Sequence, residues 1–380
     1  MTRSTPIYLD YNATTPVSAE AKAAMTAAMD VAGNPSSIHR MGRAARALIE
    51  DAREAVAALV KAKPADVIFT SGGTEANALA LKGLARAMGC VGTVCSTVEH
   101  PSVLANMSDL DSFIAVDTHG IVDLGALETR LKKSSGKLLV SVMFANNETG
   151  VLQPIAEVVR LTHGAGGLVH CDAIQAAGKT ALDMAALGVD ALSLSAHKFG
   201  GPKGVGALVL RSGMSVSPLF EGGGQEKTRR SGTENVIGIA GFGAAARDAG
   251  AWLAAMPRIE KLRDGLEARL VQSAPSVVVH GRAVPRLANT SCLSASGVAS
   301  QTQVMQLDLA GLCVSTGSAC SSGKVTLSHV LKAMGVADEL TASAIRVSLG
   351  PDTTEADVNA FLDAYGPIAQ KSAGNLAAAQ

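Results

Sequence analysis

One lysine of the sequence lies in a segment whose composition could make it a nucleophile. Lys198 belongs to SAHKFGGPKG (195–204), between apolar runs at 189–194 and 205–210 that are typical of buried strands. Open α/β sheets bind ligands at the carboxyl ends of their strands, where Lys198 is expected. Burial or a nearby cation would lower the pKa of such an amine and activate it. A solvated lysine in a hairpin turn explains the segment equally well, so the rest of the chain has to decide.

Other predicted strands also end in side chains that could do chemistry. The strands expected at 67–70, 93–96, 138–143 and 168–172 are followed or ended by Gly73, His100, Asn147 and Asp172. Helical segments separate these strands, which predicts a mostly parallel sheet covered on both faces. The four residues and Lys198 are then expected at one edge of the sheet. Loops are polar in any case, but five segments in a row with distinctive ends are hard to attribute to chance.

The loop SGGTE (71–75) has the composition of an anion-binding turn. Glycines between a strand and a helix let backbone N–H groups approach an anion, and the helix dipole favours negative charge there. The hydroxyl of Thr74 could reach a phosphate oxygen. Thr74 could equally be an ordinary helix N-cap, and the loop taken alone favours that simpler interpretation.

Together these residue types match the needs of pyridoxal phosphate. A lysine can form a Schiff base with the cofactor, and an aspartate can pair with its pyridinium nitrogen. A histidine can stack on the flat ring, while backbone amides and hydroxyls hold the phosphate. The acid matters because a protonated ring stabilises a carbanion at the α-carbon of a substrate.

A series of motifs resembles that of the cysteine desulfurases. In chain order these are LDYNATTP (9–16), TSGGTEANALA (70–80), VEHPSV (98–103), ANNETG (145–150), HCDAIQAAGK (170–179), SAHKFGGPKG (195–204), RSGTEN (230–235), GSACSSG (317–323) and IRVSLG (345–350). They cover nearly the whole chain in family order, and together they are specific where any single motif would be weak. The chain therefore resembles the NifS/IscS-like enzymes of the fold-type I pyridoxal phosphate family, the class-V aminotransferases.

The resemblance implies an α/β fold of the fold-type I class. A large pyridoxal phosphate-binding domain is expected at 16–256, with a mostly parallel sheet flanked by helices. A smaller α+β domain joins residues 1–15 to 257–380 and carries the catalytic cysteine loop. The pattern of predicted elements changes at Pro257. One helix is expected to end near Ala255 and the next to begin near Ile259.

The resemblance also implies a role for each matching residue. Lys198 matches the Schiff-base lysine that moves protons, His100 the imidazole stacked on the ring, and Cys320 the cysteine that takes the sulfur. Asn147 matches an asparagine near the ring oxygen and the substrate carboxylate, and Arg346 the arginine that clamps that carboxylate. The remaining residues that match cofactor contacts are Gly73, Thr74, Asp172, Gln175, Ser195, His197 and Thr233.

Three of these contacts have separate functions in the resembling family. Asp172 matches the acid at the ring nitrogen, Gln175 the donor to the phenolic oxygen, and Thr233 a threonine that reaches the phosphate of the partner subunit, which implies a homodimer. The implied reaction converts L-cysteine to alanine and leaves a persulfide on Cys320, for an iron–sulfur scaffold or a sulfur-carrier protein. No metal site is expected, and only Cys320 would make a transient iron–sulfur contact.

Composition argues against other classes of function. The 33 basic residues balance 33 acidic ones and aromatic residues make up 3%, so neither a basic surface nor a stacking platform for nucleic acid is expected. No apolar run reaches the ~20 residues of a membrane span, and no signal peptide is apparent, so a cytoplasmic protein is expected.

The six cysteines form no Cys-x-x-Cys pair, which argues against zinc and disulfides. Apart from Cys320, they are expected to pack as small hydrophobes.

Several alternatives remain open on the sequence alone. A selenocysteine lyase, another β-lyase or an aminotransferase would use the same scaffold, and an aminotransferase would need no thiol at position 320. A degenerate homologue acting as a sulfur carrier or scaffold-binding module is disfavoured by the intact Lys198, Asp172 and Cys320. An iron–sulfur cluster held by the scattered cysteines lacks the usual ligand spacing. The sequence does not identify the physiological sulfur acceptor.

Overall fold

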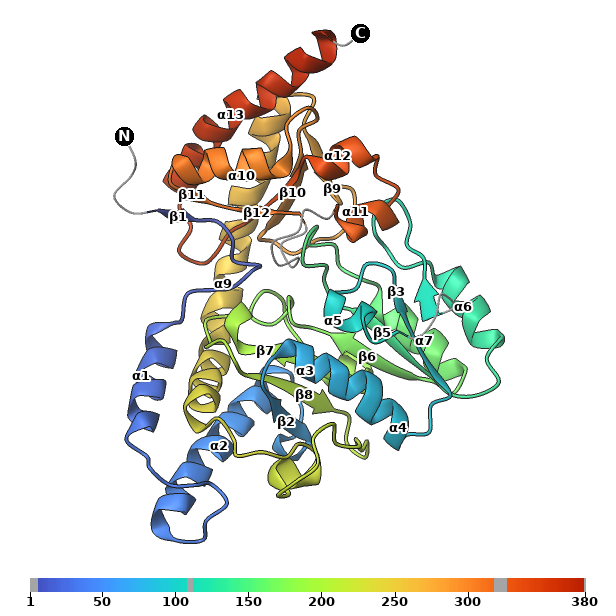
Figure 1. The fold of residues 1–380 in the computed structure, drawn as a ribbon, viewed down its shortest axis with the longest axis vertical. Coiled ribbons are helices and arrows are strands. Elements are labelled where there is room, and N and C mark those ends of the chain that lie inside the picture. The colour runs from blue at the N-terminus through green and yellow to red at the C-terminus, as the bar shows by residue number, and fades with distance from the viewer. Residues whose placement is uncertain (1–5, 108–111, 318–326, 379–380) are drawn as a thin grey trace.

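The protein has two lobes joined by one long helix (Figure 1). The computed structural model describes residues 6–107, 112–317 and 327–378. One lobe is built around a seven-stranded sheet and the other around a four-stranded sheet. The helix α9 (Val236–Ser273) runs through both lobes.

The larger sheet has the strand order β2-β8-β7-β6-β5-β3-β4. In that order its strands are Val67–Thr70, Gly206–Leu210, Ala191–Ser195, Leu168–Asp172, Leu138–Met143, Gly92–Ser96 and Phe113–Ile114. The pairs from β7 to β4 are parallel, and β8 is antiparallel to both of its neighbours. Every residue of β5, β6 and β7 is buried, as expected for strands with both faces covered. The predicted α/β fold with a mostly parallel sheet is confirmed.

Helices cover both faces of this sheet. They are α2 (Arg40–Leu59), α3 (Gly73–Ala78), α4 (Ala85–Ala87), α5 (Pro101–Leu104), α6 (Leu124–Lys132), α7 (Ile155–Gly164), α8 (Met184–Leu187) and the first half of α9, on which α1 (Ala19–Met29) packs. Alternate strand residues supply the two cores. Val140 and Val142 pack in the cluster that contains α2, α7 and α9 residues, whereas Leu139 packs on the opposite face with Leu79 and Leu84. Successive residues of β5 therefore face opposite sides of the sheet and pack in different cores.

The smaller lobe has an antiparallel sheet of order β12-β13-β10-β9. Its strands in that order are Ser315–Thr316, Ala344–Ser348, Thr290–Ser294 and Val278–His280, and its helices are α10 (Ser300–Leu309), α11 (His329–Ala333), α12 (Asp338–Ala342) and α13 (Glu355–Ala378). Residues 312–316 are divided between two sheets. β11 (Leu312–Cys313) pairs with the N-terminal β1 (Ile7–Tyr8), whereas β12 pairs with β13, because the chain changes partner at Val314.

The expected break near Pro257 is wrong, since α9 continues through this proline. The first half of α9 packs Ile239 and Phe242 in the core of the large lobe, and the second half packs Ile259 and Leu266 in the core of the small lobe. Burial on both sides compensates for the one backbone hydrogen bond that a proline removes. The helix crosses the expected 256/257 boundary, so the domain limits themselves stay a prediction.

The loop before α9 has an unusual backbone. Three consecutive residues other than glycine, Glu226, Lys227 and Thr228, have φ values of 46°, 57° and 64°. Each L-residue in this region is strained, so the surrounding structure must hold the turn. The buried carboxylate of Glu226 accepts hydrogen bonds from Arg53 Nη1 and Nη2, both at 2.8 Å, and from the backbone N–H of Phe69 at 3.0 Å. This ion pair fastens the loop to α2 and β2.

We predict that Glu226→Gln lowers the free energy of unfolding by about 3 kcal/mol, because the buried guanidinium of Arg53 then keeps only the partly exposed Glu50 as a counter-charge. Urea unfolding at one protein concentration measures the change. Lys132→Met is the control, since Lys132 pairs with Glu128 on the surface, with its side chain 72% exposed. Equal effects of the two variants would show that the buried pair does not hold the loop.

Candidate active site

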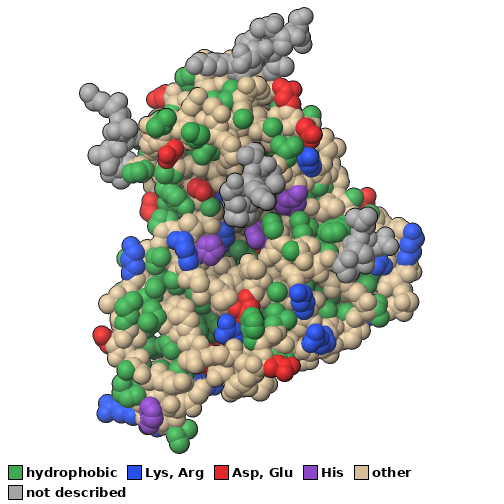
Figure 2. All heavy atoms as spheres, in the orientation of Figure 1, with side chains coloured by type: hydrophobic (Ala, Val, Ile, Leu, Met, Phe, Trp, Pro, Cys, Tyr) green, Lys and Arg blue, Asp and Glu red, His purple; other side chains and the backbone are tan. Residues whose placement is uncertain are grey.

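A cavity of about 280 Å³ lies at the carboxyl ends of the large-sheet strands and against the small sheet. Figure 2 shows histidine side chains gathered near the junction of the two lobes. The lining includes ten of the residues singled out in the sequence: Gly73, Thr74, His100, Asn147, Asp172, Gln175, Ser195, His197, Lys198 and Arg346. The expectation that the five strand ends meet at one edge is therefore confirmed.

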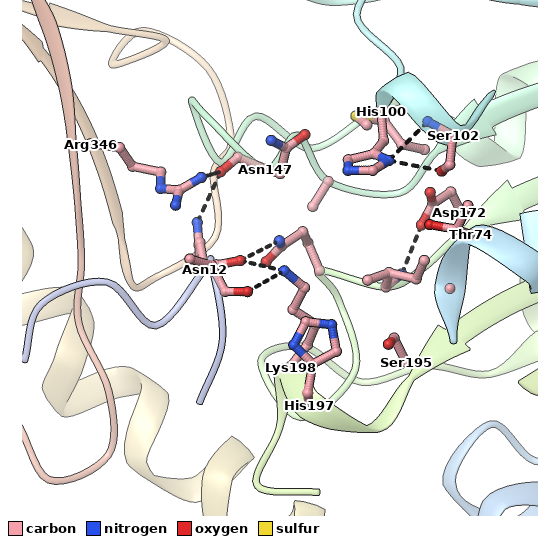
Figure 3. A pocket seen from close by; sticks show the side chains of 16 residues that line it. Asn12, Thr74, His100, Ser102, Asn147, Asp172, Ser195, His197, Lys198 and Arg346 are labelled. Carbon is pink, nitrogen blue, oxygen red and sulfur yellow. Dashed lines mark hydrogen bonds between the residues drawn. The ribbon is translucent and has the colours of Figure 1, made fainter. Parts of the chain in front are cut away.

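Lys198 ends a short 3-10 helix, Ala196–Lys198, which directly follows β7. Its Nζ donates hydrogen bonds to the carbonyl oxygens of Asn12, at 2.7 Å, and Ala13, at 2.8 Å. The turn is held in place by Thr15, whose N–H and hydroxyl both donate to the carbonyl oxygen of His197. The amine of Lys198 is thus directed into the cavity by Asn12 and Ala13, which lie 186 and 185 residues away in the sequence (Figure 3).

Asp172 provides a buried carboxylate at the end of β6. Its Oδ2 accepts from Asn77 Nδ2 at 2.7 Å, and its Oδ1 accepts from the N–H of Ile174 at 3.0 Å. Burial raises the pKa of Asp172, and His100 and these hydrogen bonds oppose the shift. A carboxylate held in this way is well suited to pair with a cationic N–H group.

His100 caps α5 and lines the cavity near Asp172. Its Nδ1 accepts the backbone N–H of Ser102 at 3.1 Å and lies 2.8 Å from the Ser102 hydroxyl. Burial lowers the pKa of His100. The imidazole is therefore neutral at neutral pH, and because Nδ1 accepts a hydrogen bond, its proton is on Nε2.

The helix that follows the Gly-Gly-Thr loop is not capped by the residue that the sequence favoured. The N-cap of α3 is Gly72, so Thr74 is the second residue of the helix and the interpretation of Thr74 as the N-cap is wrong. The carboxylate of Glu75 accepts the N–H of Ser71 at 2.7 Å and so takes over part of the capping. The Thr74 side chain lines the cavity beside Ser195 and His197, together with the first residue of the helix, where a helix dipole favours an anion.

Arg346 lies on β13, across the cavity from Asp172 (Figure 3). Its side chain is almost fully buried; Nη1 donates to the carbonyl oxygen of Asn147 at 3.0 Å and Nη2 to Asp10 at 2.7 Å. Its Nε finds no hydrogen-bond partner among the described residues. A buried guanidinium that lines the cavity is suited to bind a carboxylate.

Comparison with known proteins agrees with this arrangement. The family model "Aminotransferase class-V" matches residues 7–361. The cysteine desulfurase IscS of Dictyoglomus turgidum is 42% identical over 375 residues, covering 96% of this chain and 95% of the relative. A cysteine desulfurase of Cereibacter sphaeroides is 43% identical, covering 95% of each chain. This chain belongs to the cysteine desulfurases of the class-V aminotransferase family.

A solved structure also supports membership of the cysteine desulfurase family. The X-ray structure of the NifS-like protein from Rickettsia africae is similar with a TM-score of 0.87 and 38% identity, covering 96% of this chain and 99% of that one. Helices long and apolar enough to cross a membrane are not found in the described part of the chain. The described residues likewise contain no cluster of three or more metal-ligating side chains.

One predicted site residue, Thr233, is exposed and lies outside the lining of the cavity in its own chain. Another, Cys320, lies outside the described residues, so its role stays a prediction. Of the other cysteines, Cys95, Cys171 and Cys292 are buried while Cys90 and Cys313 are half-buried, and burial raises the pKa of all five thiols. They are poor thiolates, in keeping with the expected packing role.

Sequence reasoning missed several polar residues that hold the site. Asn77 donates to Asp172, Ser102 contacts His100, and Asn12 accepts from Lys198. All three stand inside motifs that the sequence analysis quoted, at 9–16, 70–80 and 98–103. Their position in those motifs was the available signal, but the residues they contact could be identified only in the folded chain.

A further buried acid stands next to His100. Glu99 Oε1 accepts from the Ser96 hydroxyl at 2.5 Å and from the N–H of Met143 at 2.9 Å, whereas Oε2 has no hydrogen-bond partner among the described residues. Burial raises the pKa of Glu99 to about 8. The carboxyl group is therefore protonated at neutral pH.

This raised pKa gives a pH prediction. In the unfolded chain Glu99 releases its proton near pH 4.3, so between about pH 4.3 and about pH 8 the folded protein binds one proton more than the unfolded one. Stability from this group is full below that window and falls as the pH rises through it, by at most about 1.4 kcal/mol per pH unit.

We expect Glu99→Gln to remove this dependence, because glutamine keeps the acceptor and cannot ionise. Relative to wild type, the variant should gain stability between about pH 5 and about pH 8 in urea unfolding. Glu128→Gln, at an exposed acid, should show no such gain. A constant difference between Glu99→Gln and wild type over this range would contradict the prediction.

Proposed function

We propose that this protein is a pyridoxal 5'-phosphate-dependent cysteine desulfurase that converts L-cysteine to L-alanine and leaves the sulfur as a persulfide on Cys320. The observation that carries the proposal is the cavity itself, in a chain of this family. It places an amine, Lys198, between a buried carboxylate, Asp172, and a buried guanidinium, Arg346. An amino acid bound through its carboxylate would thus have its α-carbon near the amine.

The residues present fit pyridoxal 5'-phosphate. Asp172 would hold the ring nitrogen and Gln175 the ring oxygen, while His100 would cover the ring. The phosphate would lie at the start of α3, among Gly73, Thr74, Ser195 and His197. When bound, the cofactor supplies an electron sink that stabilises negative charge at the α-carbon of an amino acid.

Lys198 and His100 would move the protons. Lys198 takes the proton from the α-carbon of L-cysteine, and the carbonyl oxygens of Asn12 and Ala13 hold its Nζ in place before the reaction. Neutral His100 can exchange its Nε2 proton near the substrate sulfur, since Ser102 occupies Nδ1. Because burial keeps its pKa low, His100 stays neutral, with its proton on Nε2, below the pH at which an exposed imidazole protonates.

Arg346 and Asn147 would orient the substrate. The guanidinium, which lines the cavity, would bind the carboxylate of L-cysteine through the hydrogens of Nη1 and Nη2 that Asn147 and Asp10 do not use. The carbonyl oxygen of Asn147 accepts from Arg346 and from Asn12, which fixes the loop after β5 at the same point. Binding of the carboxylate orients the amino acid, and the side chain is then the part that can differ between substrates.

The sulfur step balances without an outside oxidant. The thiolate of Cys320 attacks the sulfur of the substrate, so an S–S bond forms while the Cβ–S bond breaks. The electron pair of the broken bond stays with the substrate carbon, which takes up a proton and leaves as alanine. The persulfide would pass to an iron–sulfur scaffold or a sulfur-carrier protein. The cytoplasmic location expected from the sequence stays a prediction.

The test compares the products of L-cysteine turnover by wild type and Cys320→Ala. Wild type should form alanine and reducible sulfur in equal amounts, and the variant should keep its cofactor but lose nearly all of both products, since the sulfur has no acceptor. Cys90→Ala, which removes another half-buried thiol, should behave as wild type. Release of sulfide and pyruvate by both proteins, or transamination by both, would contradict the proposed function.

We propose in addition that the enzyme is a homodimer whose sites each receive Thr233 from the partner subunit. Arg230 pairs with Glu75 at 2.8 Å, so the loop that carries Thr233 is tied to the start of α3 in its own chain. The Thr233 side chain nevertheless remains exposed rather than reaching its own cavity. An exposed threonine beside a phosphate site is available to a neighbouring copy.

Complementation tests the shared site. Lys198→Ala alone should be inactive, and Thr233→Ala alone should be impaired without added cofactor. A random mixture should recover about one quarter of wild-type activity, since half of the dimers are mixed and one of the two sites in each is intact. A mixture no more active than the average of its two components would rule out sharing.

A further inference from the structure

A buried lysine outside the cavity is not used by the mechanism above. Lys179 lies four residues after Gln175, in the turns that follow β6, and its side chain is 3% exposed. Its Nζ donates to Gln175 Oε1 at 2.8 Å and to Asn12 Oδ1 at 2.9 Å. Burial lowers the pKa of Lys179 far below that of an exposed lysine, and Lys198 and Arg346 add to the shift. A charged amine costs free energy in such a buried position. We therefore expect this side chain to have a function.

The contact with Lys179 fixes which way the amide of Gln175 points. The Nζ of Lys179 donates to this amide, so the group that faces it is the amide oxygen. The Nε2 of Gln175 then points to the other side, where it donates one hydrogen to the carbonyl oxygen of Asn12 at 2.9 Å. The second hydrogen of Nε2 is left for the cavity that Gln175 lines.

The same amine orders Asn12. Its Oδ1 accepts from Lys179 and from Asn289 at 3.0 Å, so its Nδ2 faces Thr290 at 2.8 Å and the carbonyl oxygen of Asn147 at 3.3 Å. The main-chain oxygen of Asn12 is thereby left to accept from Lys198 and Gln175. The amine of Lys179 therefore sets the orientation of both amides next to Lys198.

We propose that Lys179 is a positioning residue, which holds the side-chain oxygens of Gln175 and Asn12 so that Gln175 presents only N–H donors to the cavity. This proposal rests on the proposed function, in which the ring oxygen of pyridoxal 5'-phosphate is the acceptor for Gln175. Without Lys179 the amide of Gln175 is free to turn its oxygen towards the cavity, where it would face an electron-rich atom of the cofactor. Loss of Lys179 should therefore weaken the binding of the cofactor.

The experiment measures binding of pyridoxal 5'-phosphate to the apoprotein by equilibrium dialysis, and the pH midpoint of the visible absorption change of the bound cofactor. Lys179→Met should weaken binding by about 10-fold, equivalent to the loss of one buried hydrogen bond. Its absorption midpoint should move to higher pH, because Gln175 no longer holds an N–H donor towards the ring oxygen. Lys61→Met, at a lysine 69% exposed, is the matched control and should match wild type in both measurements.

A double variant separates positioning from general damage. If Lys179 acts through Gln175, Lys179→Met should add little to the effect of Gln175→Leu, so the two losses of affinity should not multiply. Lys179→Gln carries the same comparison if Lys179→Met does not fold. Multiplying losses, or a lower melting temperature with unchanged affinity and absorption, would overturn the proposal. A wild-type apoprotein that takes up no cofactor would instead overturn the proposed function and, with it, this inference.

Discussion

The active site depends on the hydrogen bonds of Asn12, which join the two lobes at the cavity. Its N–H donates to the hydroxyl of Ser348 on β13, and its side chain contacts Thr290 on β10, so it is tied to the small sheet. Its carbonyl oxygen accepts from Lys198 and Gln175, which belong to the large lobe. Because most of these groups are buried, losing one partner would leave several polar atoms unsatisfied. The reacting amine therefore has a defined position only when both lobes are in place.

Charge is distributed across the cavity in a way that suits an amino acid and a pyridinium ring. Arg346 provides positive charge on the side of the small sheet, and Asp172 provides a carboxylate at the end of β6 (Figure 3). Burial also raises the pKa of Glu148, an acid outside the lining, to about 7. Asp172 is the acid among the described residues that line the cavity, where a cationic ring nitrogen would need it.

The sheet topology explains how one short turn brings Lys198 to the reaction centre. β7 ends the parallel run that also includes β5 and β6, so Asn147, Asp172 and Lys198 come from neighbouring strand ends. β8 then returns antiparallel to β7, which keeps the lysine turn short and closely held. The strained turn at 226–228 has a comparable support in the Arg53–Glu226 pair. In both cases a buried interaction fixes a backbone that the local sequence alone would leave free.

The sequence by itself determined the elements whose signals are local. The strands β2, β5 and β6 have the predicted bounds, and their polar ends lie at one edge, because strand patterning and parallel topology follow from neighbouring residues. Only the tertiary structure decided that α9 continues through Pro257 and that Gly72, rather than Thr74, caps α3. It alone showed that Lys179 and Asn12 support the site. These outcomes depend on contacts between distant residues, such as Asn12 and Ser348, which are 336 positions apart, and no local pattern encodes such contacts.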